Sequence, residues 1–244
     1  MESQLLTKTL AQIVNENHQA ASVFEKYGLD FCCKGKRSLE KACTEKNLLQ
    51  EIVLQELVNL SQQQTKEFID FNNLSLKELT GYIISTHHAY VKQQGPPIVA
   101  YLQKVAAKHG ERHNELYRIF ENFASLKEEL ENHMHKEEQI LFPRIIELEN
   151  ADELFCDRIT LNYLQAPVSV MEHEHEHAGK LLEEIHRYSS NYTPPADACT
   201  TYRLGFAALR AFESDLHQHI HLENNILFPK AIKLFLDSRE ASLN

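Results

Sequence analysis

The sequence predicts an all-α protein, an up-down-up-down four-helix bundle that follows a small N-terminal helical domain. The first indication is composition, because only 7 Gly, 7 Pro and no Trp occur among 244 residues rich in Leu, Ile, Ala, Glu and Lys. The second is an internal repeat in which a helix pair recurs at a fixed spacing. Neither pair could bury its apolar stripe alone, so we expect the two pairs to pack together as one bundle.

One motif carries the repeat. The pattern H-x-H-x-E-x-x-I-L-F-P spans residues 133–143 and again residues 219–229. In each copy the first histidine and the glutamate are four residues apart, so both side chains lie on the same face of a helix. The apolar residues that follow turn this face inward, where an unpartnered carboxylate is too costly to keep. A metal ion is therefore the favoured partner.

Two further histidines keep the same spacing. His88 and His175 are 87 residues apart, and the two motif copies are 86 residues apart. Each half then has a helix with a lone histidine, followed by a helix with the motif. Four such helices would supply six metal ligands: His88, His133, Glu137, His175, His219 and Glu223.

Neighbouring histidines compete for two of these places. His87 adjoins His88, only one of them can face the bundle axis, and the repeat selects His88. In the third helix, His173 and His177 share one face while His175 lies on the other, and the repeat selects His175. We expect the remaining histidines to lie at the surface: His18, His109, His113, His135, His186, His217 and His221.

The ligand types indicate the metal. Four imidazoles and two carboxylates without a thiolate suit iron, and two facing carboxylates can bridge two ions. A structural zinc ion would instead be four-coordinate and closed. We expect two non-haem iron ions bridged by Glu137 and Glu223, with open positions for water, oxo, dioxygen or nitric oxide. A metal-free helical scaffold is the alternative, which metal analysis would decide.

Charge and cysteine usage exclude several classes of protein. The formal charge of −10 repels nucleic acid, and no cluster of Lys and Arg is interleaved with aromatic residues. The apolar runs are too short to span a membrane, and residues 1–4 do not resemble a secretion signal. Five cysteines form no disulfide framework. We expect a cytoplasmic protein with reduced thiols, in which Cys156 and Cys199 are packing residues.

The chain divides into residues 1–65, a small helical domain with a Cys-Cys loop, and residues 75–238, the bundle. In the first part, Gly28 is expected to end a helix and Ser38 to cap the next one. Ser75 begins a capping box at the start of the bundle. The short helices are expected at residues 6–14, 19–27, 39–46 and 48–63.

Prolines are expected to divide the bundle into its helices. The first helix should end before Gly95-Pro96-Pro97, because proline lacks an amide donor and disfavours helix at the preceding residue. Pro143 and Pro229 should produce matched kinks rather than ends, since apolar periodicity resumes after each. The other helices are then expected at residues 97–149, with an interruption near 109–110, at 167–188 and at 195–236.

With these ligands in place, residues 75–238 resemble a hemerythrin-type di-iron bundle. Residues 27–39, Y-G-L-D-F-C-C-K-G-K-R-S-L, followed by Cys43, are similar to the small Cys-Cys domain of the iron–sulfur cluster repair di-iron proteins, the repair-of-iron-centres family of the YtfE and ScdA type. The phrases at residues 133–143, 167–175, 193–195 and 222–229 are also similar to that family. The resemblance covers almost the whole chain and implies the six ligands chosen from the repeat. Around His88 the sequence departs from the family pattern.

The resemblance implies a function. It implies a di-iron protein that repairs iron–sulfur clusters damaged by oxidative and nitrosative stress, as a source of iron. Its partners would be the damaged cluster proteins and two small gases, nitric oxide and dioxygen. The sequence is also compatible with a homodimer. The alternatives are an enzyme that reduces nitric oxide at the two irons, and a hemerythrin-like module that binds or senses dioxygen or nitric oxide.

Cys32 and Cys33 are candidates for a thiol relay of iron or electrons. The flanking Lys34, Lys36 and Arg37 are expected to lower the pKa of these thiols and favour thiolates. The alternative is that both cysteines are packing residues of a protein-docking domain.

Overall fold

The N-terminal part consists of short helices with capped ends. The computed structural model describes residues 2–62, 69–150 and 160–242, and these contain helices and turns but no strand. Thr9 forms a capping box, Ser38 Oγ accepts from the Lys41 amide at 3.3 Å, and Gly28 follows a helix with a φ of 61°. The cap at Ser38 and the left-handed backbone of Gly28 agree with the predicted helix ends. The helices here are α1 (Glu2–Thr7), α2 (Leu10–Glu16), α3 (Ala20–Lys26), α4 (Leu39–Glu45) and α5 (Gln50–Gln62).

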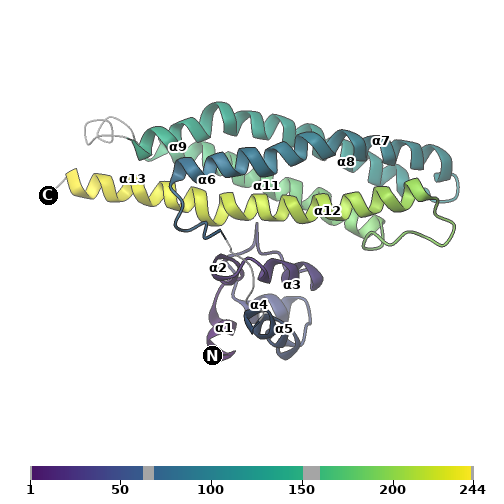
Figure 1. Ribbon diagram of the computed structural model, residues 1–244, viewed down its shortest axis with the longest axis horizontal. Helices are drawn as coiled ribbons and strands as arrows, with labels where there is room; N and C mark the ends of the chain where they lie inside the picture. Colours follow the sequence, from purple (N-terminus) through teal and green to yellow (C-terminus); the bar gives the residue numbers. More distant parts are fainter. Residues whose placement is uncertain (1, 63–68, 151–159, 243–244) are drawn as a thin grey trace.

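The rest of the described chain is the predicted four-helix bundle (Figure 1). Three of its long helices contain a short π-helical segment, and one does not. The first comprises α6 (Leu76–Ile83), η1 (Ile84–His88) and α7 (Ala89–His109), and the second α8 (Glu115–Lys136), η2 (Glu137–Leu141) and α9 (Phe142–Glu149). The third is α11 (Asn162–Tyr188), and the fourth comprises α12 (Thr200–Leu222), η3 (Glu223–Leu227) and α13 (Phe228–Ser242).

The predicted end of the first helix at Gly95-Pro96-Pro97 is wrong. Both prolines lie inside α7, which continues to His109. Val91, Ile98 and Leu102 keep helical spacing and are buried, so tertiary packing outweighs the local cost of proline. The second helix therefore does not begin at residue 97.

The chain reverses instead at Gly110, the position predicted as an interruption. A Cβ atom at this glycine would lie 2.4 Å from the Ala106 carbonyl oxygen and 2.4 Å from the Tyr117 ring. Only glycine fits so close an approach between the turn and α8.

As predicted, Pro143 and Pro229 do not end their helices. A π segment precedes each of them. The Phe142 amide donates to the Glu137 carbonyl, and the Phe228 amide donates to the Glu223 carbonyl, both five residues back. A proline cannot donate to the carbonyl four residues earlier and clashes with it, and the wider π turn accommodates this loss. The two glutamates of the repeated motif thus begin equivalent π segments.

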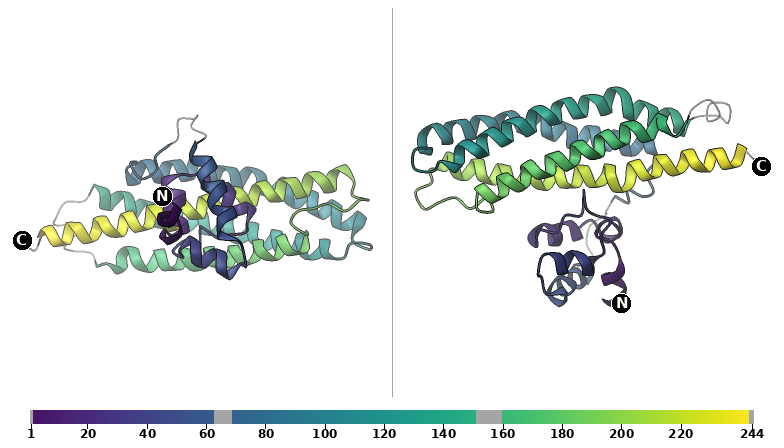
Figure 2. Two further views of the ribbon diagram at one scale, coloured as in Figure 1. Left: turned by 90° about the horizontal axis from the view of Figure 1, so that it is seen from below. Right: turned by 180° about the vertical axis from the view of Figure 1, so that it is seen from behind.

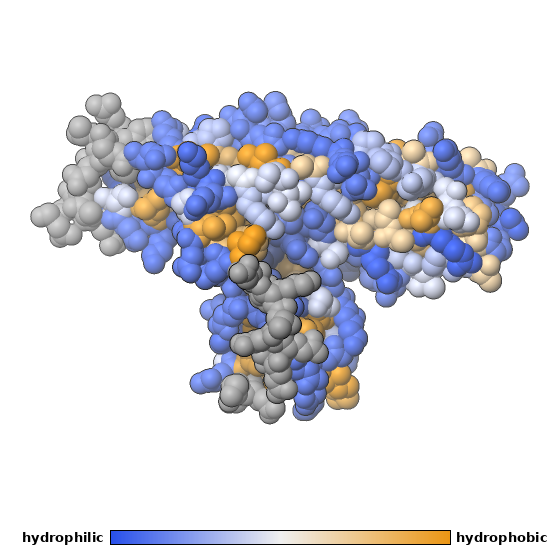
Figure 3. Space-filling view, in the orientation of Figure 1, coloured by the Kyte–Doolittle hydropathy of each residue, from blue (hydrophilic) through white to orange (hydrophobic). Residues whose placement is uncertain are grey.

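Buried apolar residues form two clusters along the bundle. One includes Phe123, Leu130 and Leu216 and extends into the N-terminal domain, and the other includes Phe142 and Phe228. Most of the face shown in Figure 3 is hydrophilic, in keeping with amphipathic helices whose apolar stripes face inward. Between the two clusters lies a layer of buried histidines and glutamates.

The N-terminal domain packs beside the middle of the bundle, and one of its loops reaches α11 and α12 (Figures 1 and 2). The contacts combine rings and polar groups. The Phe31 ring meets the His221 ring edge-on, Asn15 Oδ1 lies 2.9 Å from His221 Nε2, and the Asn225 amide donates to the Cys32 carbonyl at 3.0 Å. No helix of the described chain has the length and apolar character needed to cross a membrane.

Phe212→Ala tests the packing of the bundle. The Phe212 ring is buried and meets the Phe123 ring edge-on at 5.1 Å, so its removal should lower the free energy of unfolding by about 3–5 kcal/mol. Leu204→Ala, at a residue of α12 that is 53% exposed, should change it by less than about 0.5 kcal/mol. Urea unfolding followed by circular dichroism measures both, and equal effects would contradict this packing.

Candidate metal centre

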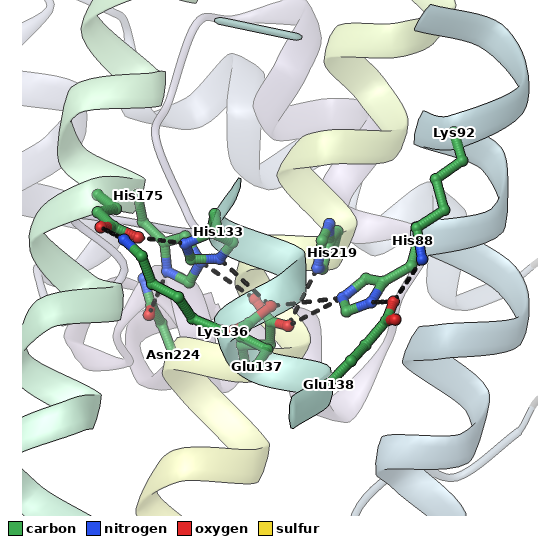
Figure 4. A network of polar contacts seen from close by, with 11 residues as sticks. His88, Lys92, His133, Lys136, Glu137, Glu138, His175, His219 and Asn224 are labelled. Atoms are coloured by element: carbon green, nitrogen blue, oxygen red, sulfur yellow. Dashed lines mark hydrogen bonds and ion pairs between the residues drawn. The ribbon is translucent and has the colours of Figure 1, made fainter. Parts of the chain in front are cut away.

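The six predicted ligands come together in one buried layer (Figure 4). Each long helix contributes at least one side chain. The first and third helices each supply a histidine, and the second and fourth each supply a histidine and a glutamate. All six side chains are at most 3% exposed: His88, His133, Glu137, His175, His219 and Glu223.

One group of four lies between the first and fourth helices. His88 Nε2 is 3.4 Å from Glu137 Oε2 and 3.8 Å from Glu223 Oε1. His219 Nε2 is 3.0 Å from the same Glu223 oxygen. The candidate ligand atoms of these four residues all lie within 4.8 Å of one another, close enough to surround one cation. We call this the His88–His219 position.

The second group lies between the second and third helices. His133 Nε2 is 3.3 Å from Glu137 Oε2, and His175 Nε2 is 3.1 Å from Glu223 Oε2. These two imidazole nitrogens are 3.0 Å apart. We call this the His133–His175 position. Because both groups contain Glu137 and Glu223, the two carboxylates could bridge two cations.

Unpaired buried atoms show that the layer fits cations. Both oxygens of Glu137, Glu223 Oε2 and His88 Nε2 are buried without a hydrogen bond among the described residues. Buried carboxylate oxygens without a hydrogen bond are costly, and two cations between the glutamates would satisfy these oxygens. The donor set of imidazoles and carboxylates, without thiolates, suits a borderline or hard metal ion.

The electrostatics of the layer also favour positive charge. Burial lowers the pKa of His88, but the nearby carboxylates of Glu137 and Glu223 outweigh burial and raise it to about 9. Burial also lowers the pKa of His133, but the charge of Glu137 outweighs burial and the pKa rises to about 10. Despite burial, the histidines hold the pKa of both carboxyls below its usual range. Protons on two imidazoles thus balance the charge that metal ions would balance.

An outer ring of polar side chains orients the imidazoles. Glu138 Oε1 lies 2.8 Å from His88 Nδ1, and Asn224 Oδ1 lies 2.9 Å from His175 Nδ1. Glu138 and Asn224 each directly follow the glutamate of a motif copy. Sequence reasoning missed this equivalence, although the repeat contained the signal.

The third member of the ring is Glu174, which precedes His175. Its Oε2 lies 2.9 Å from His133 Nδ1, and its other oxygen accepts from Lys136. The hydrogen bond from His133 is the main cause that lowers the pKa of Glu174, to about 2, against partial burial. Such partners fix the tautomer and direction of a ligand histidine.

The structure distinguishes the predicted ligand histidines from their neighbours in the sequence. His175 is buried in the layer, whereas His173 and His177 are exposed on α11. A pocket of about 380 Å³ between α8 and α11 is lined by both exposed histidines and also by His133 and His175. His87 is buried as well, but its Nδ1 lies 3.0 Å from Asp215 Oδ1, outside the four-residue groups.

Two of the predicted surface histidines are buried. His109 is 3% exposed and its Nε2 lies 3.3 Å from Cys199 Sγ, and His221 is 2% exposed beneath the N-terminal domain. Phe31 and Asn15 of the N-terminal domain contact the His221 ring, so the docking of that domain contributes to its burial. Burial lowers the pKa of His221 to about 4. His135 is exposed, as predicted.

The Cys-Cys loop lies against the helix that carries His175. Cys33 Sγ is 3.7 Å from the His175 carbonyl oxygen and 3.7 Å from Cys32 Sγ. With Asp30, the two cysteines form a third group that could hold a metal ion. Asp30 Oδ1 also accepts from the amides of Cys32 and Cys33 at 3.2 and 2.9 Å, which holds the loop closed.

The predicted activation of Cys32 by nearby cations is wrong. The hydrogen bond with the Cys33 thiol, burial and the carboxylate of Asp30 raise the pKa of Cys32 well above its usual value. Lys34 is exposed, and Arg37 pairs with Glu45. Cys199 is partly buried, in keeping with a packing role, and Cys156 lies outside the described residues.

A four-helix bundle with buried groups of histidine and glutamate that share two carboxylates defines a class of hemerythrin-like cation-binding proteins. The family model of the hemerythrin HHE cation binding domain matches residues 81–231. A second model, the ScdA_N domain of unknown function, matches residues 6–61.

Curated relatives match over both parts of the chain. The chain is 36% identical over 223 residues to the iron-sulfur cluster repair protein YtfE of Enterobacter sp. (strain 638), which covers 91% of this chain and 96% of that protein. Proteins of the same name from Escherichia coli O157:H7 and Shigella boydii serotype 4 (strain Sb227) are each 36% identical over 214 residues, 88% of this chain and 91% of each relative. The chain therefore belongs to the family of the iron-sulfur cluster repair proteins YtfE, with a hemerythrin HHE domain.

Glu138→Gln tests the outer ring. This carboxylate accepts from both His88 and Lys92, and an amide would reduce the basicity of His88. Metal affinity at the His88–His219 position should fall about 10 to 100-fold, measured by competition with a chelator. Glu131→Gln on the same helix, where the exposed carboxylate pairs with Lys127, is the control and should not change the affinity.

Proposed function

We propose that the chain is a di-iron protein that repairs iron–sulfur clusters damaged by oxidative and nitrosative stress, and that it acts by supplying iron. The observation that carries the proposal is the pair of buried groups that share Glu137 and Glu223, with carboxylate oxygens left unpaired. The printed name of the relatives, iron-sulfur cluster repair protein YtfE, supports the same function for this chain.

The ligand residues suit a protein that gives up its metal. His88, His133, His175 and His219 would hold iron together with Glu137 and Glu223, and protonation of an imidazole competes with its binding of the metal. Bound iron would supply the metal that a damaged cluster has lost, and its open positions would accept nitric oxide or dioxygen. The pocket of about 380 Å³ beside His133 and His175 gives this layer an approach from the surface.

The position of the Cys-Cys loop supports a relay of iron. Cys33 Sγ lies against the backbone of His175, and Asp30, Cys32 and Cys33 could together hold a cation between the buried layer and a client protein. Because the pKa of Cys32 is raised, a metal would have to displace its proton. The packing of neighbouring Phe31 on His221 holds the same loop against the bundle, and a packing role for both cysteines is the alternative.

Other features distinguish this function from its competitors. Carriage of dioxygen in the manner of hemerythrins would be supported by an extra histidine ligand on the third helix, but His173 and His177 are exposed. Reduction of nitric oxide at two irons remains the second candidate, since the same open positions would serve it. The cytoplasmic location and the damaged cluster proteins as partners are part of the proposal.

Repair can be tested directly with the full chain loaded anaerobically with ferrous iron. A hydrolyase whose [4Fe–4S] cluster has been damaged by nitric oxide should recover activity when this protein is added. Glu137→Gln removes a carboxylate shared by both metal positions, so both ions should be lost and recovery should cease. Iron content and recovered activity are measured together.

The control is Glu128→Gln, an exposed residue of the same helix, which should keep two irons and full recovery. A protein that binds no transition metal, or one that binds iron without restoring the damaged enzyme, would contradict the proposal. Nitrous oxide released in proportion to protein after anaerobic addition of nitric oxide would indicate the reductase instead.

The relay is tested by Cys32→Ser with Cys33→Ser. The double variant should keep both bound irons but transfer them to the damaged cluster several-fold more slowly, because serine hydroxyls are poor ligands for soft or borderline metals. Cys199→Ser, at the far end of the bundle beside His109, is the matched control. Unchanged transfer by the double variant would leave only the docking role.

A further inference from the structure

Three of the four imidazoles in the layer of candidate ligands have a polar partner on the side that faces away from the two shared carboxylates. Glu138, Glu174 and Asn224 contact the Nδ1 atoms of His88, His133 and His175 at 2.8–2.9 Å. His219 is the exception. Its Nε2 faces Glu223 at 3.0 Å, but its Nδ1 is buried without a hydrogen-bond partner among the described residues.

The internal repeat explains which residue stands where the missing partner would be. His175 follows His88 by 87 residues, so Glu174, which directly precedes His175, corresponds to His87. His219 corresponds in the same way to His133. The contact between Glu174 and His133 is therefore repeated, in the other half, by His87 and His219. A carboxylate occupies the place in one half and an imidazole in the other.

His87 contacts the ring of His219 rather than its nitrogen. The two rings are parallel within 10°, with centroids 5.7 Å apart. The Nδ1 atom of His87 lies 3.0 Å from Asp215 Oδ1, and Tyr82 meets the His87 ring edge-on at 5.8 Å. His87 is 3% exposed, and the second oxygen of Asp215 is buried without a hydrogen bond. These contacts hold the His87 ring in place against the ring of His219.

This difference bears on the strength of metal binding. A ligand histidine that binds through Nε2 carries a proton on Nδ1, and a buried donor without an acceptor is costly. An acceptor at that proton also raises the basicity of the ligand and fixes its direction, and its loss lowers metal affinity about 10 to 100-fold. Only the His88–His219 position contains such a histidine.

We propose that His87 is a positioning residue that holds His219 by ring stacking alone, and that it thereby makes the His88–His219 position the weaker of two unequal metal positions. The inference rests on the proposed metal centre and deepens it. A protein that supplies iron then has one ion that leaves first and one that stays with the bundle.

Partial loading of the full chain locates the stronger position. Crystals are grown from protein loaded with one equivalent of ferrous iron per chain, and anomalous-scattering maps are recorded at the iron edge. The iron occupancy at the His133–His175 position should be about tenfold or more higher than at the His88–His219 position. Equal occupancy, or higher occupancy between His88 and His219, would overturn the inference while leaving the di-iron function intact. Absence of iron from both positions would overturn both.

His87→Gln tests the residue itself. A glutamine carbonyl at this place can accept from His219 Nδ1, and its amide can donate to Asp215, whose second oxygen is unpaired. The ratio of the two affinities, measured by stepwise competition with a chelator, should fall about tenfold or more toward unity. Ser85→Gln, at an exposed residue of the same π segment, is the control and should leave the ratio unchanged.

Glu174→Leu provides a second, opposite test. It removes the acceptor from His133, so the ratio should again approach unity, this time because the stronger position weakens. Each variant is checked by circular dichroism and by retained iron binding. A ratio that neither His87→Gln nor Glu174→Leu changes would overturn the role of the outer partners.

Discussion

The structure depends on two carboxylates that are held away from water. Glu137 and Glu223 are fully buried in a layer between two apolar clusters, where a negative charge is tolerated only beside a positive one. Four imidazoles face them, and each glutamate begins a π segment in which its side chain is buried. This layer of histidines and glutamates interrupts the apolar core, so the helices that build the fold also build the candidate site.

The repeat makes the site nearly symmetric, and its exceptions carry information. Glu138 and Asn224 occupy equivalent places and support His88 and His175. The correspondence fails at the residue before the lone histidine of each half, where a carboxylate binds His133 and a stacked ring covers His219. A pocket also opens on the side of His133 and His175. Two positions built from one ancestral pattern can thus differ in affinity and in access.

The N-terminal domain brings a second type of candidate ligand, the cysteine thiol, close to the imidazoles of the bundle. Its Cys-Cys loop touches the backbone of the helix that carries His175, while Phe31 and Asn15 cover His221. Thiols in the loop and imidazoles in the bundle are separated by a single helix. The pKa of Cys32 is raised because its neighbours are a thiol, a carboxylate and apolar groups rather than the basic residues beside it in the sequence. Sequence proximity of Lys34 and Arg37 was a poor guide to the field at the sulfur.

The sequence by itself determined the helical class, the repeated helix pair and the six residues of the layer, because a four-residue spacing fixes which side chains share a helix face. It also indicated the helix caps at Ser38 and Ser75, whose hydrogen bonds are local. Only the tertiary structure decided that α7 continues through Pro96 and Pro97, since packing of distant helices outweighs a local penalty. Burial of His109 and His221, and the partners of each imidazole, likewise depend on contacts between segments far apart in the chain, which no local pattern encodes.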